Sequence, residues 1–206
     1  SLKECKKTIV SIFVNPTQFN NKSDYKNYPR NNNKDFSILK KLKVNFLYVP
    51  KENDIYYFKR KSVIKLKKKD EILCAKYRKG HFEGVIDVME RLTKIIKPQK
   101  IYMGEKDFQQ LHLVKKYIKK KFNTKIISCK TIRDTNKLAF SSRNKLLYKS
   151  ELKRARKISN ELFLFKRRLA NKKNLKNLIL EKKNQLTDLF NIRFDYLELR
   201  NEFTLK

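Results

Sequence analysis

The sequence is poor in glycine, cysteine, histidine and acidic side chains, and it contains no tryptophan. Its 206 residues include only 3 glycines, 3 cysteines and 2 histidines. The cysteines, Cys5, Cys74 and Cys129, are odd in number and lack CxxC spacing. His81 and His112 have no metal-ligand side chains beside them in the sequence. We therefore expect free thiols in a reducing compartment and no resident metal ion.

Long apolar runs and secretory signals are also missing. A membrane-spanning helix needs about 20 consecutive apolar residues, and no stretch of this sequence approaches that length. No signal peptide is visible at the start, where Ser1 stands in place of an initiator methionine. Hydrophobic residues make up 40% of the chain, enough for a core, and the length fits one domain with a small appendage. We expect a cytoplasmic protein without membrane contact.

Acidic residues are outnumbered, since 53 Lys and Arg against 20 Asp and Glu give a net charge of +33. Such a charge is typical of nucleic-acid-binding proteins. Here, however, the basic residues are mostly lysines spread along the whole chain, and they accompany abundant asparagine and isoleucine. Because the codons for these three residues are AT-rich, the composition favours drift in an AT-rich genome over dedicated nucleic-acid binding. We expect the charge to attract anionic substrates, and RNA only without specificity.

The chain is organised around a strand-to-helix turn near its middle. An apolar run at residues 101–103 ends in Gly104, and apolar residues then recur three and four apart from Phe108 onward. In an open α/β sheet, ligands bind at such a turn beside the helix N-terminus. A lysine for phosphate, a carboxylate for a ribose hydroxyl and amides for a polar substrate would make a nucleotide-plus-substrate site. The alternative is a solvated first helical turn with ordinary capping. The residues concerned are Gly104, Glu105, Lys106, Asp107, Gln109 and Gln110.

Other patterns predict an α/β region followed by a smaller, mainly helical one. Continuous β-rich apolar runs suit strands buried on both faces of a parallel sheet, whereas apolar residues at helical spacing predict amphipathic helices. Because the pattern changes after Asn144, we predict an α/β domain at 1–144 and a smaller α+β domain at 145–206. Strands are expected at 8–14, 44–49, 101–104, 124–129 and 194–199, with a possible strand at 62–66, and helices at 35–43, 82–96, 108–121, 151–170 and 175–191.

Three polar segments lie where binding residues gather, after strands or before helices. A turn at Asn15 and Pro16 puts Gln18 at the carboxyl end of an expected strand. Residues 78–84 contain a cation, a histidine and two glycines, which suggests either a loop folded close over a ligand or a plain turn opening the next helix. Residues 141–143, Ser-Ser-Arg, combine two hydroxyl donors with a guanidinium that can hold phosphate, although this tripeptide also occurs in ordinary loops.

Five segments, in this order, resemble the pantothenate synthetase family. They are residues 11–19 (SIFVNPTQF), 28–30 (YPR), 80–85 (GHFEGV), 104–110 (GEKDFQQ) and 138–144 (LAFSSRN). The resemblance implies a Rossmann-like nucleotidyltransferase domain with a parallel sheet and a smaller second domain, usually in a dimer. It also implies that pantoate and β-alanine are joined with ATP and Mg²⁺. The pantoate carboxylate would attack the α-phosphorus of ATP to give pantoyl adenylate, and the β-alanine amine would then displace AMP.

The resemblance also implies a role for each matching side chain. Pantoate would be held by Gln18 and Gln110, with Gln18 also near β-alanine, and Tyr28, Arg78 and His81 would be further substrate-site residues. ATP would be bound by Gly104, Glu105, Lys106, Asp107, Ile132, Phe140, Ser141, Ser142 and Arg143. Of these, the residues expected to act in catalysis are Lys106, Ser141, Ser142 and Arg143. Positioned cations and hydroxyl donors stabilise the charge that builds on departing pyrophosphate.

Departures from the family pattern leave two alternatives open. The family's His-x-Gly-His turn, which follows its first strand and helps bind the nucleotide, is not found here. We therefore expect the first strand to be missing and the C-terminal domain to be truncated. Lys137 stands where the family usually has glycine, and Phe140 replaces a usual leucine. The alternatives are a catalytically degenerate relative, slower by roughly 10² to 10⁴ for one lost catalytic group, and a basic nucleic-acid-binding protein on the same fold.

Overall fold

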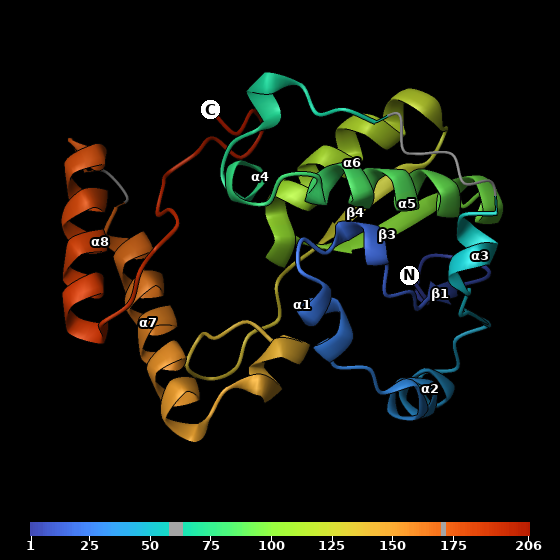
Figure 1. The fold of residues 1–206 in the computed structure, drawn as a ribbon, viewed down its shortest axis with the longest axis horizontal. Helices are drawn as coiled ribbons and strands as arrows, with labels where there is room; N and C mark the ends of the chain where they lie inside the picture. Colours follow the sequence, from blue (N-terminus) through green and yellow to red (C-terminus); the bar gives the residue numbers. More distant parts are fainter. Residues whose placement is uncertain (58–63, 170–171) are drawn as a thin grey trace. The chain divides into compact units, whose positions relative to one another are not determined.

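The computed structural model describes residues 1–57, 64–169 and 172–206, which form two compact units (Figure 1). Unit 1 comprises Ser1–Cys129 and unit 2 comprises Lys130–Lys206. The two units divide before the domain boundary predicted after Asn144, so residues 141–143 belong to the same unit as the C-terminal helices. The fold is a helix-rich α/β arrangement with parallel strands, as predicted.

Unit 1 contains two pairs of parallel strands. Their bounds are Ile9–Ser11 for β1, Phe46–Tyr48 for β2, Lys100–Gly104 for β3 and Lys125–Cys129 for β4. β1 pairs with β2, and β3 pairs with β4 in a register that ends with Gly104 opposite Cys129. The first two strands are shorter than the apolar runs at 8–14 and 44–49, because a strand extends only as far as its partner completes the ladder of hydrogen bonds.

Helices α5 (His81–Ile96) and α6 (Phe108–Lys121) provide much of the core of unit 1. α6 packs against α5 and against both β3 and β4 (Figure 1). Val85 of α5 is buried together with Val114 and Ile118 of α6, and residues of both strands pack against this cluster. Apolar residues three and four apart produce these buried faces, as the sequence pattern predicted.

Short helices and 3₁₀ turns connect the strands and long helices of unit 1. Three of them begin at an asparagine: the Asn15 side chain accepts from Thr17 N, the Asn21 side chain from Ser23 N and the Asn31 side chain from Lys34 N. Asparagine is a strong N-cap residue, so the abundant asparagines start helices as well as making turns. The bounds are Lys22–Asn27 for α1, Asn32–Lys41 for α2, Glu52–Ile55 for α3, Cys74–Tyr77 for α4, Pro16–Gln18 for η1, Lys68–Asp70 for η2 and Glu105–Asp107 for η3.

Unit 2 begins with a hairpin and continues with a 3₁₀ turn and two long helices. An antiparallel bridge joins Arg133 to Ala139 in the hairpin. The helices predicted at 151–170 and 175–191 are confirmed within the described residues. The bounds are Ser142–Leu146 for η4, Lys149–Arg168 for α7 and Leu175–Phe190 for α8.

One strand prediction is wrong, and another lies partly outside the residues that the structure describes. The strand predicted at 194–199 is wrong, because this segment forms no β-strand with any described part of the chain. A β-rich apolar pattern becomes a strand only where a neighbouring strand supplies hydrogen bonds. The possible strand at 62–66 lies partly outside the described residues, and its described part, residues 64–66, is not a strand.

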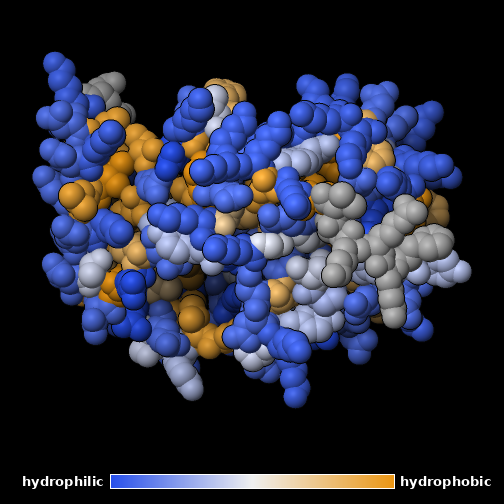
Figure 2. Space-filling view, turned by 45° about the horizontal axis from the view of Figure 1, so that its top comes forward, coloured by the Kyte–Doolittle hydropathy of each residue, from blue (hydrophilic) through white to orange (hydrophobic). Residues whose placement is uncertain are grey.

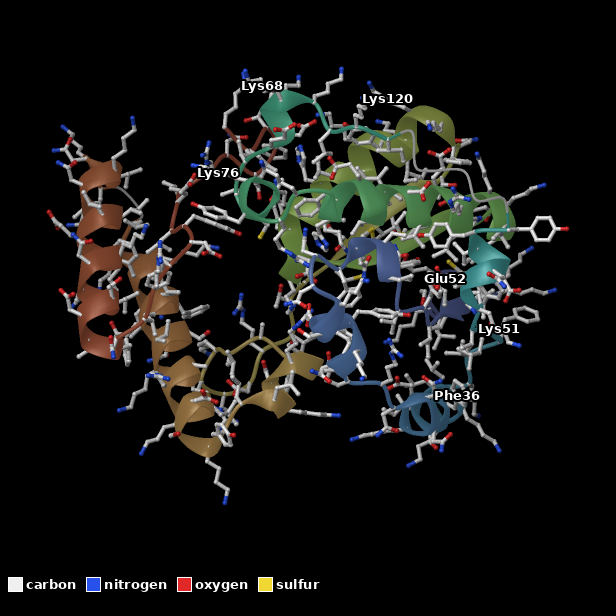
Figure 3. All side chains as sticks on the ribbon, viewed as in Figure 1. Phe36, Lys51, Glu52, Lys68, Lys76 and Lys120 are labelled. Atoms are coloured by element: carbon white, nitrogen blue, oxygen red, sulfur yellow. The ribbon has the colours of Figure 1, made fainter. Side chains whose placement is uncertain are left out.

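Hydrophilic side chains dominate the visible surface. Figure 2 shows hydrophilic residues over most of the face in view, with smaller hydrophobic areas between them. Lys68, Lys76 and Lys120 come from different elements of unit 1, are exposed and extend away from the ribbon (Figure 3). The positive charge is thus dispersed here, as its spread along the sequence predicted. None of the helices in the described ranges is long and apolar enough to cross a lipid bilayer.

Candidate active site

A buried asparagine fixes the turn that carries Gln18. Asn15 is only 1% exposed, and its Nδ2 donates to the Gly84 carbonyl of α5 at 3.1 Å. Its Oδ1 accepts from the backbone N of Thr17 at 3.2 Å and from the Tyr56 hydroxyl at 2.8 Å. Both ends of the buried amide are therefore satisfied. The 3₁₀ turn η1 is held against α5, with half-buried Gln18 at its end.

His81 holds the same turn from the start of α5. It is 7% exposed, and its Nδ1 lies 2.7 Å from the carbonyl oxygen of Gln18. Since a carbonyl oxygen only accepts, Nδ1 carries the hydrogen in this contact. The structure thus brings together Gln18 and His81, two residues that the resemblance assigns to the substrate site.

The two glycines beside His81 each have a structural explanation. Gly80 has φ +79°, in the left-handed region that favours glycine, and α5 starts directly after it. A Cβ on Gly84 would lie 2.6 Å from the Thr17 carbonyl oxygen, so glycine lets α5 approach η1 this closely. A turn that opens α5 is therefore present, whereas a loop that closes over a ligand stays a prediction.

Tyr28 and Arg78 border the same region of unit 1. The Tyr28 ring meets the edge of Phe19 with 5.5 Å between ring centroids. Arg78 ends α4 and is half-buried. The residue after it, Lys79, accepts at its carbonyl a 2.6 Å hydrogen bond from Asn20 Nδ2. The four predicted substrate-site residues of this region thus come from segments that are bonded to one another.

The strand-to-helix turn predicted from the sequence is present. β3 ends at Gly104, half-buried Glu105 begins η3, and α6 starts at Phe108. A Cβ on Gly104 would meet nothing within 4 Å, so the end of the strand borders open space. Lys106 Nζ lies 3.3 Å from Asp107 Oδ1, and the two side chains are 40% and 63% exposed. Such an exposed ion pair stabilises the fold little, so both charges can bind a ligand at small cost.

The two glutamines of α6 have different surroundings. Gln109 is 7% exposed, and its Nε2 donates to the carbonyls of Ile72 at 2.7 Å and Asp70 at 3.2 Å. These bonds anchor the segment that leads to Arg78. Gln110, the next residue, is half-buried. The sequence pattern noted amide groups at both positions, and the resemblance assigned only Gln110 to pantoate. The structure places Gln109 in a buried hydrogen-bond network, and Gln110 stays the candidate substrate ligand.

The predicted ATP-binding residues of unit 2 lie in the hairpin and in the turn that follows it. Phe140 N donates to the Ile132 carbonyl at 3.1 Å, and the two side chains are 59% and 69% exposed. Ser141 caps η4, since its hydroxyl accepts from Arg143 N at 3.3 Å, and Ser142 begins that turn. One continuous segment therefore carries all five residues.

The hairpin turn contains the lysine that replaces the family's usual glycine. Lys137 has φ +68°, where an L side chain is strained. Asp134 braces this turn: its Oδ1 accepts from Asn136 N at 2.9 Å and from Leu138 N at 3.0 Å, and its Oδ2 accepts from Arg156 Nε at 2.8 Å. Burial acts to raise the pKa of Asp134, but the hydrogen bonds from Arg156 and the two amides outweigh it, so this pKa is lowered.

Sequence reasoning missed Asn15 and Tyr56 as supports of the site. The Asn-Pro pair signalled a turn, but the bond between Asn15 and Gly84 spans 69 residues. The bond between Tyr56 and Asn15 spans 41 residues. Pattern and spacing report local structure, so they give no signal for such contacts.

Within residues 1–57, 64–169 and 172–206, no group of three or more His, Cys, Asp or Glu side chains could hold a metal ion. Mg²⁺ that accompanies ATP takes most of its ligands from phosphates and water, and needs only one or two protein carboxylates.

The parallel α/β unit, with exposed Lys106 and Asp107 at its strand-to-helix turn, is consistent with a nucleotidyltransferase-like fold. Within this class, the chain belongs to the pantoate–β-alanine ligase family. The family model described as "Pantoate-beta-alanine ligase" matches residues 1–206. The resemblance drawn from the five segments is thereby confirmed.

Curated relatives cover most of this chain but are themselves longer. The chain is 46% identical over 162 residues to a bifunctional pantoate ligase/cytidylate kinase from Prochlorococcus marinus subsp. pastoris, a match that covers 77% of this chain and 32% of the relative. It is 47% identical over 154 residues to a pantothenate synthetase from Francisella tularensis subsp. novicida, with 73% and 58% covered. The chain thus spans about a third of the first relative and somewhat over half of the second.

Solved structures of the family have the same fold. Pantothenate synthetase from Thermus thermophilus matches with a TM-score of 0.92 at 28% identity, covering 100% of this chain and 75% of that one. Pantoate–β-alanine ligase from Francisella tularensis, solved in complex with β-γ ATP and β-alanine, matches with a TM-score of 0.84 at 37% identity. That match covers 97% of this chain and 74% of the ligase.

Proposed function

We propose that this chain catalyses the ATP-dependent joining of pantoate to β-alanine, an AMP-forming ligation of pantothenate biosynthesis. The observation that carries the proposal is the β3–η3–α6 turn, which presents exposed Lys106 and Asp107 beside the open space at Gly104. Membership of the pantoate–β-alanine ligase family supports the choice of substrates. The complex of the Francisella relative with β-γ ATP and β-alanine supports two of the three.

The first half-reaction would form pantoyl adenylate. A carboxylate oxygen of pantoate attacks the α-phosphorus of ATP, and the bond from that phosphorus to pyrophosphate breaks. Gln18 and Gln110 orient pantoate, while Gly104 and Asp107 contact the adenosine. Lys106 offsets the negative charge that builds on the leaving pyrophosphate, which is the main way a protein speeds phosphoryl and nucleotidyl transfer.

The second half-reaction would form the amide. The amine of β-alanine attacks the carbonyl carbon of the adenylate, AMP leaves with the bonding electron pair, and the amine loses a proton.

During the first step, the hydroxyls of Ser141 and Ser142 and the guanidinium of Arg143 hold the triphosphate. Ile132 would offer backbone contacts to adenine, and Phe140 directly precedes Ser141 in the chain. Mg²⁺ supplies further positive charge on the phosphates when it is bound.

A homodimer in the cytoplasm is part of the same proposal. All three cysteines are free thiols, which fits a reducing compartment. Unit 1 exposes apolar side chains such as Leu42 at 55% and Phe46 at 51%, and exposed apolar side chains are candidates for coverage by a second copy. Light scattering over a range of concentrations tests the dimer, and a constant mass of 24.9 kDa would contradict it.

The experiment that tests the ligase activity is pantoate-dependent exchange of pyrophosphate into ATP with Mg²⁺. Lys106→Ala should slow this exchange about a hundredfold, because it removes a cation from the developing charge. Lys120→Ala is the matched control: the residue is an exposed lysine near the far end of α6 and extends away from the ribbon (Figure 3). It removes the same formal charge as Lys106→Ala. Because salt screens an exposed charge, we expect Lys120→Ala to leave the rate of exchange within about twofold of the unaltered chain.

Two results would contradict the proposal. The first is a folded, soluble chain that shows no exchange with pantoate, ATP and Mg²⁺, as expected for a catalytically degenerate relative. The second is exchange that falls equally in Lys106→Ala and Lys120→Ala, because that would report only the net charge of +33.

A further inference from the structure

Tyr56 joins the turn that carries Gln18 to the middle of α5. It directly follows α3, and its hydroxyl donates to Asn15 Oδ1 at 2.8 Å and lies 3.1 Å from Thr17 Oγ1. The guanidinium of Arg91 lies over its ring, 4.8 Å from the centroid. Arg91 in turn donates to Asp87 Oδ2 at 3.1 Å within α5. Tyr56 is therefore held on its ring face as well as at its hydroxyl.

The hydrogen bonds around Asn15 can be satisfied in one consistent arrangement. Three donors lie within reach of its Oδ1: Thr17 N, Thr17 Oγ1 at 3.0 Å and the Tyr56 hydroxyl. A carbonyl oxygen has two lone pairs. If Thr17 N and the Tyr56 hydroxyl occupy them, the Thr17 hydroxyl donates to the Tyr56 oxygen, and every group is bonded. Burial raises the pKa of Tyr56, which keeps its hydroxyl protonated and donating at neutral pH.

We propose that Tyr56 is a positioning residue that sets the orientation of Gln18 through Asn15 and Thr17. Without the Tyr56 hydroxyl, Asn15 Oδ1 loses its shortest contact, and the Thr17 hydroxyl loses one of its two partners. The backbone of η1 that precedes Gln18 is then held by fewer hydrogen bonds. The part of this inference that concerns pantoate rests on the proposed function, since Gln18 is the proposed pantoate ligand.

The activity test compares Tyr56→Phe with Tyr57→Phe. Tyr56→Phe keeps the ring under Arg91 and removes only the hydroxyl, whereas Tyr57 is the neighbouring residue and is 79% exposed. In the exchange assay, Tyr56→Phe should raise the KM for pantoate about fivefold and lower kcat less, in line with one lost hydrogen bond. Tyr57→Phe should change neither. An unchanged KM for pantoate in Tyr56→Phe would overturn the inference.

A double-mutant cycle separates positioning from a general loss of stability. If Tyr56 acts through Gln18, then Tyr56→Phe should have no further effect on the KM for pantoate once Gln18→Ala is present. Effects that multiply, giving the same fivefold change in both backgrounds, would mean that Tyr56 acts by another route and would overturn the proposal.

A measurement without substrate distinguishes failure of this inference from failure of the proposed function. The side-chain amide signals of Gln18 in an ¹⁵N NMR spectrum are identified by their disappearance in Gln18→Ala. They should shift in Tyr56→Phe and stay in place in Tyr57→Phe. If the unaltered chain shows no exchange but these signals shift, the proposed function fails and the positioning role stands. If the signals do not shift, the positioning role fails whatever the activity.

Discussion

The two units of the chain contain long amphipathic helices of similar size, but they bury very different parts of them. In unit 1, the buried apolar residues of α6 are Leu111, Leu113, Val114 and Ile118. In unit 2, the 20-residue α7 has no buried residue, and α8 has only Leu186 among the described residues. Helical spacing of apolar residues is therefore not enough for burial, which depends on the elements that pack against the helix.

The candidate residues of the two units are supported in correspondingly different ways. In unit 1, the turn that carries Gln18 is held by the hydrogen bond from Asn15 to Gly84 and by the contact of His81 with the Gln18 carbonyl, which both link segments far apart in the sequence. In unit 2, the hairpin before Ser141 is braced by Asp134 through bonds to residues at most 22 positions away. We therefore expect substitutions in unit 1 to affect stability through the packing of distant segments, and substitutions in the hairpin to affect only the turn itself.

The largest effect on stability should come from the single buried leucine of α8. Leu186 is 0% exposed, so Leu186→Ala removes buried apolar surface and leaves a cavity. We expect the free energy of unfolding to fall by about 3 kcal/mol, measured by urea denaturation with circular dichroism. Leu189→Ala is the control on the same helix, because Leu189 is 64% exposed, and it should cost less than about 0.5 kcal/mol. Equal losses would show that unit 2 does not depend on this one buried contact.

Gly84→Ala should be the next largest change and should act in unit 1. Alanine normally stabilises a helix relative to glycine by about 1 kcal/mol, but here its Cβ would meet the Thr17 carbonyl oxygen at 2.6 Å. We expect a net loss of about 2 kcal/mol in the free energy of unfolding from this overpacking.

The matched control for this glycine is Gly104→Ala, whose Cβ would meet nothing within 4 Å. It should change the free energy of unfolding by less than about 0.5 kcal/mol. If Gly84→Ala proves stabilising instead, α5 and η1 are not in the close contact that holds Gln18 in place.

Lys137→Gly should stabilise unit 2 by a small amount. The lysine has φ +68°, which costs an L residue about 1–2 kcal/mol, and glycine gives back part of this gain through its greater freedom in the unfolded chain. We expect a net gain of about 0.5 kcal/mol, read from the urea midpoint. Lys145→Gly, in the helical turn η4, should have the opposite sign. A loss in both variants would mean that the contact of Lys137 with the Phe163 ring, at 5.2 Å, outweighs the backbone strain.

The smallest expected effect is a change in how the free energy of unfolding depends on pH when Asp134 is replaced. Its folded pKa is lowered, so its contribution to stability is present above the ordinary aspartate pKa and is lost as the pH falls through the folded pKa. Asp134→Asn should therefore destabilise the chain at pH 7 and make little difference once the carboxyl is protonated. Unfolding measured from pH 7 down to pH 2 tests this, with exposed Asp107→Asn as the control. If Asp134→Asn lowers the free energy of unfolding by the same amount at every pH, ionisation of Asp134 is not the cause of the loss.

Much of the fold could be predicted because the relevant signals are local. Apolar residues from Phe108 to Ile118 predicted α6 and its end near Lys121, and Gly104 predicted the turn before it. The strand predicted at 194–199 is absent because a strand needs a partner, which no local pattern can supply. The same holds for the candidate site. The turn with Lys106 was predicted from a local pattern, whereas the hydrogen bonds of Asn15 and Tyr56 that hold the Gln18 turn were not.

The family, the long helices and the candidate ligands could be inferred from the residues alone, because motifs and helical periodicity depend on neighbouring residues. The folded structure was needed to find which of these residues have structural roles. It showed that Gln109 is buried in hydrogen bonds to the segment before Arg78, and that Gly84 is required where α5 meets η1. It also showed that Tyr56 completes the bonding of Asn15. These roles depend on contacts between residues 34 to 69 positions apart, which folding alone brings together.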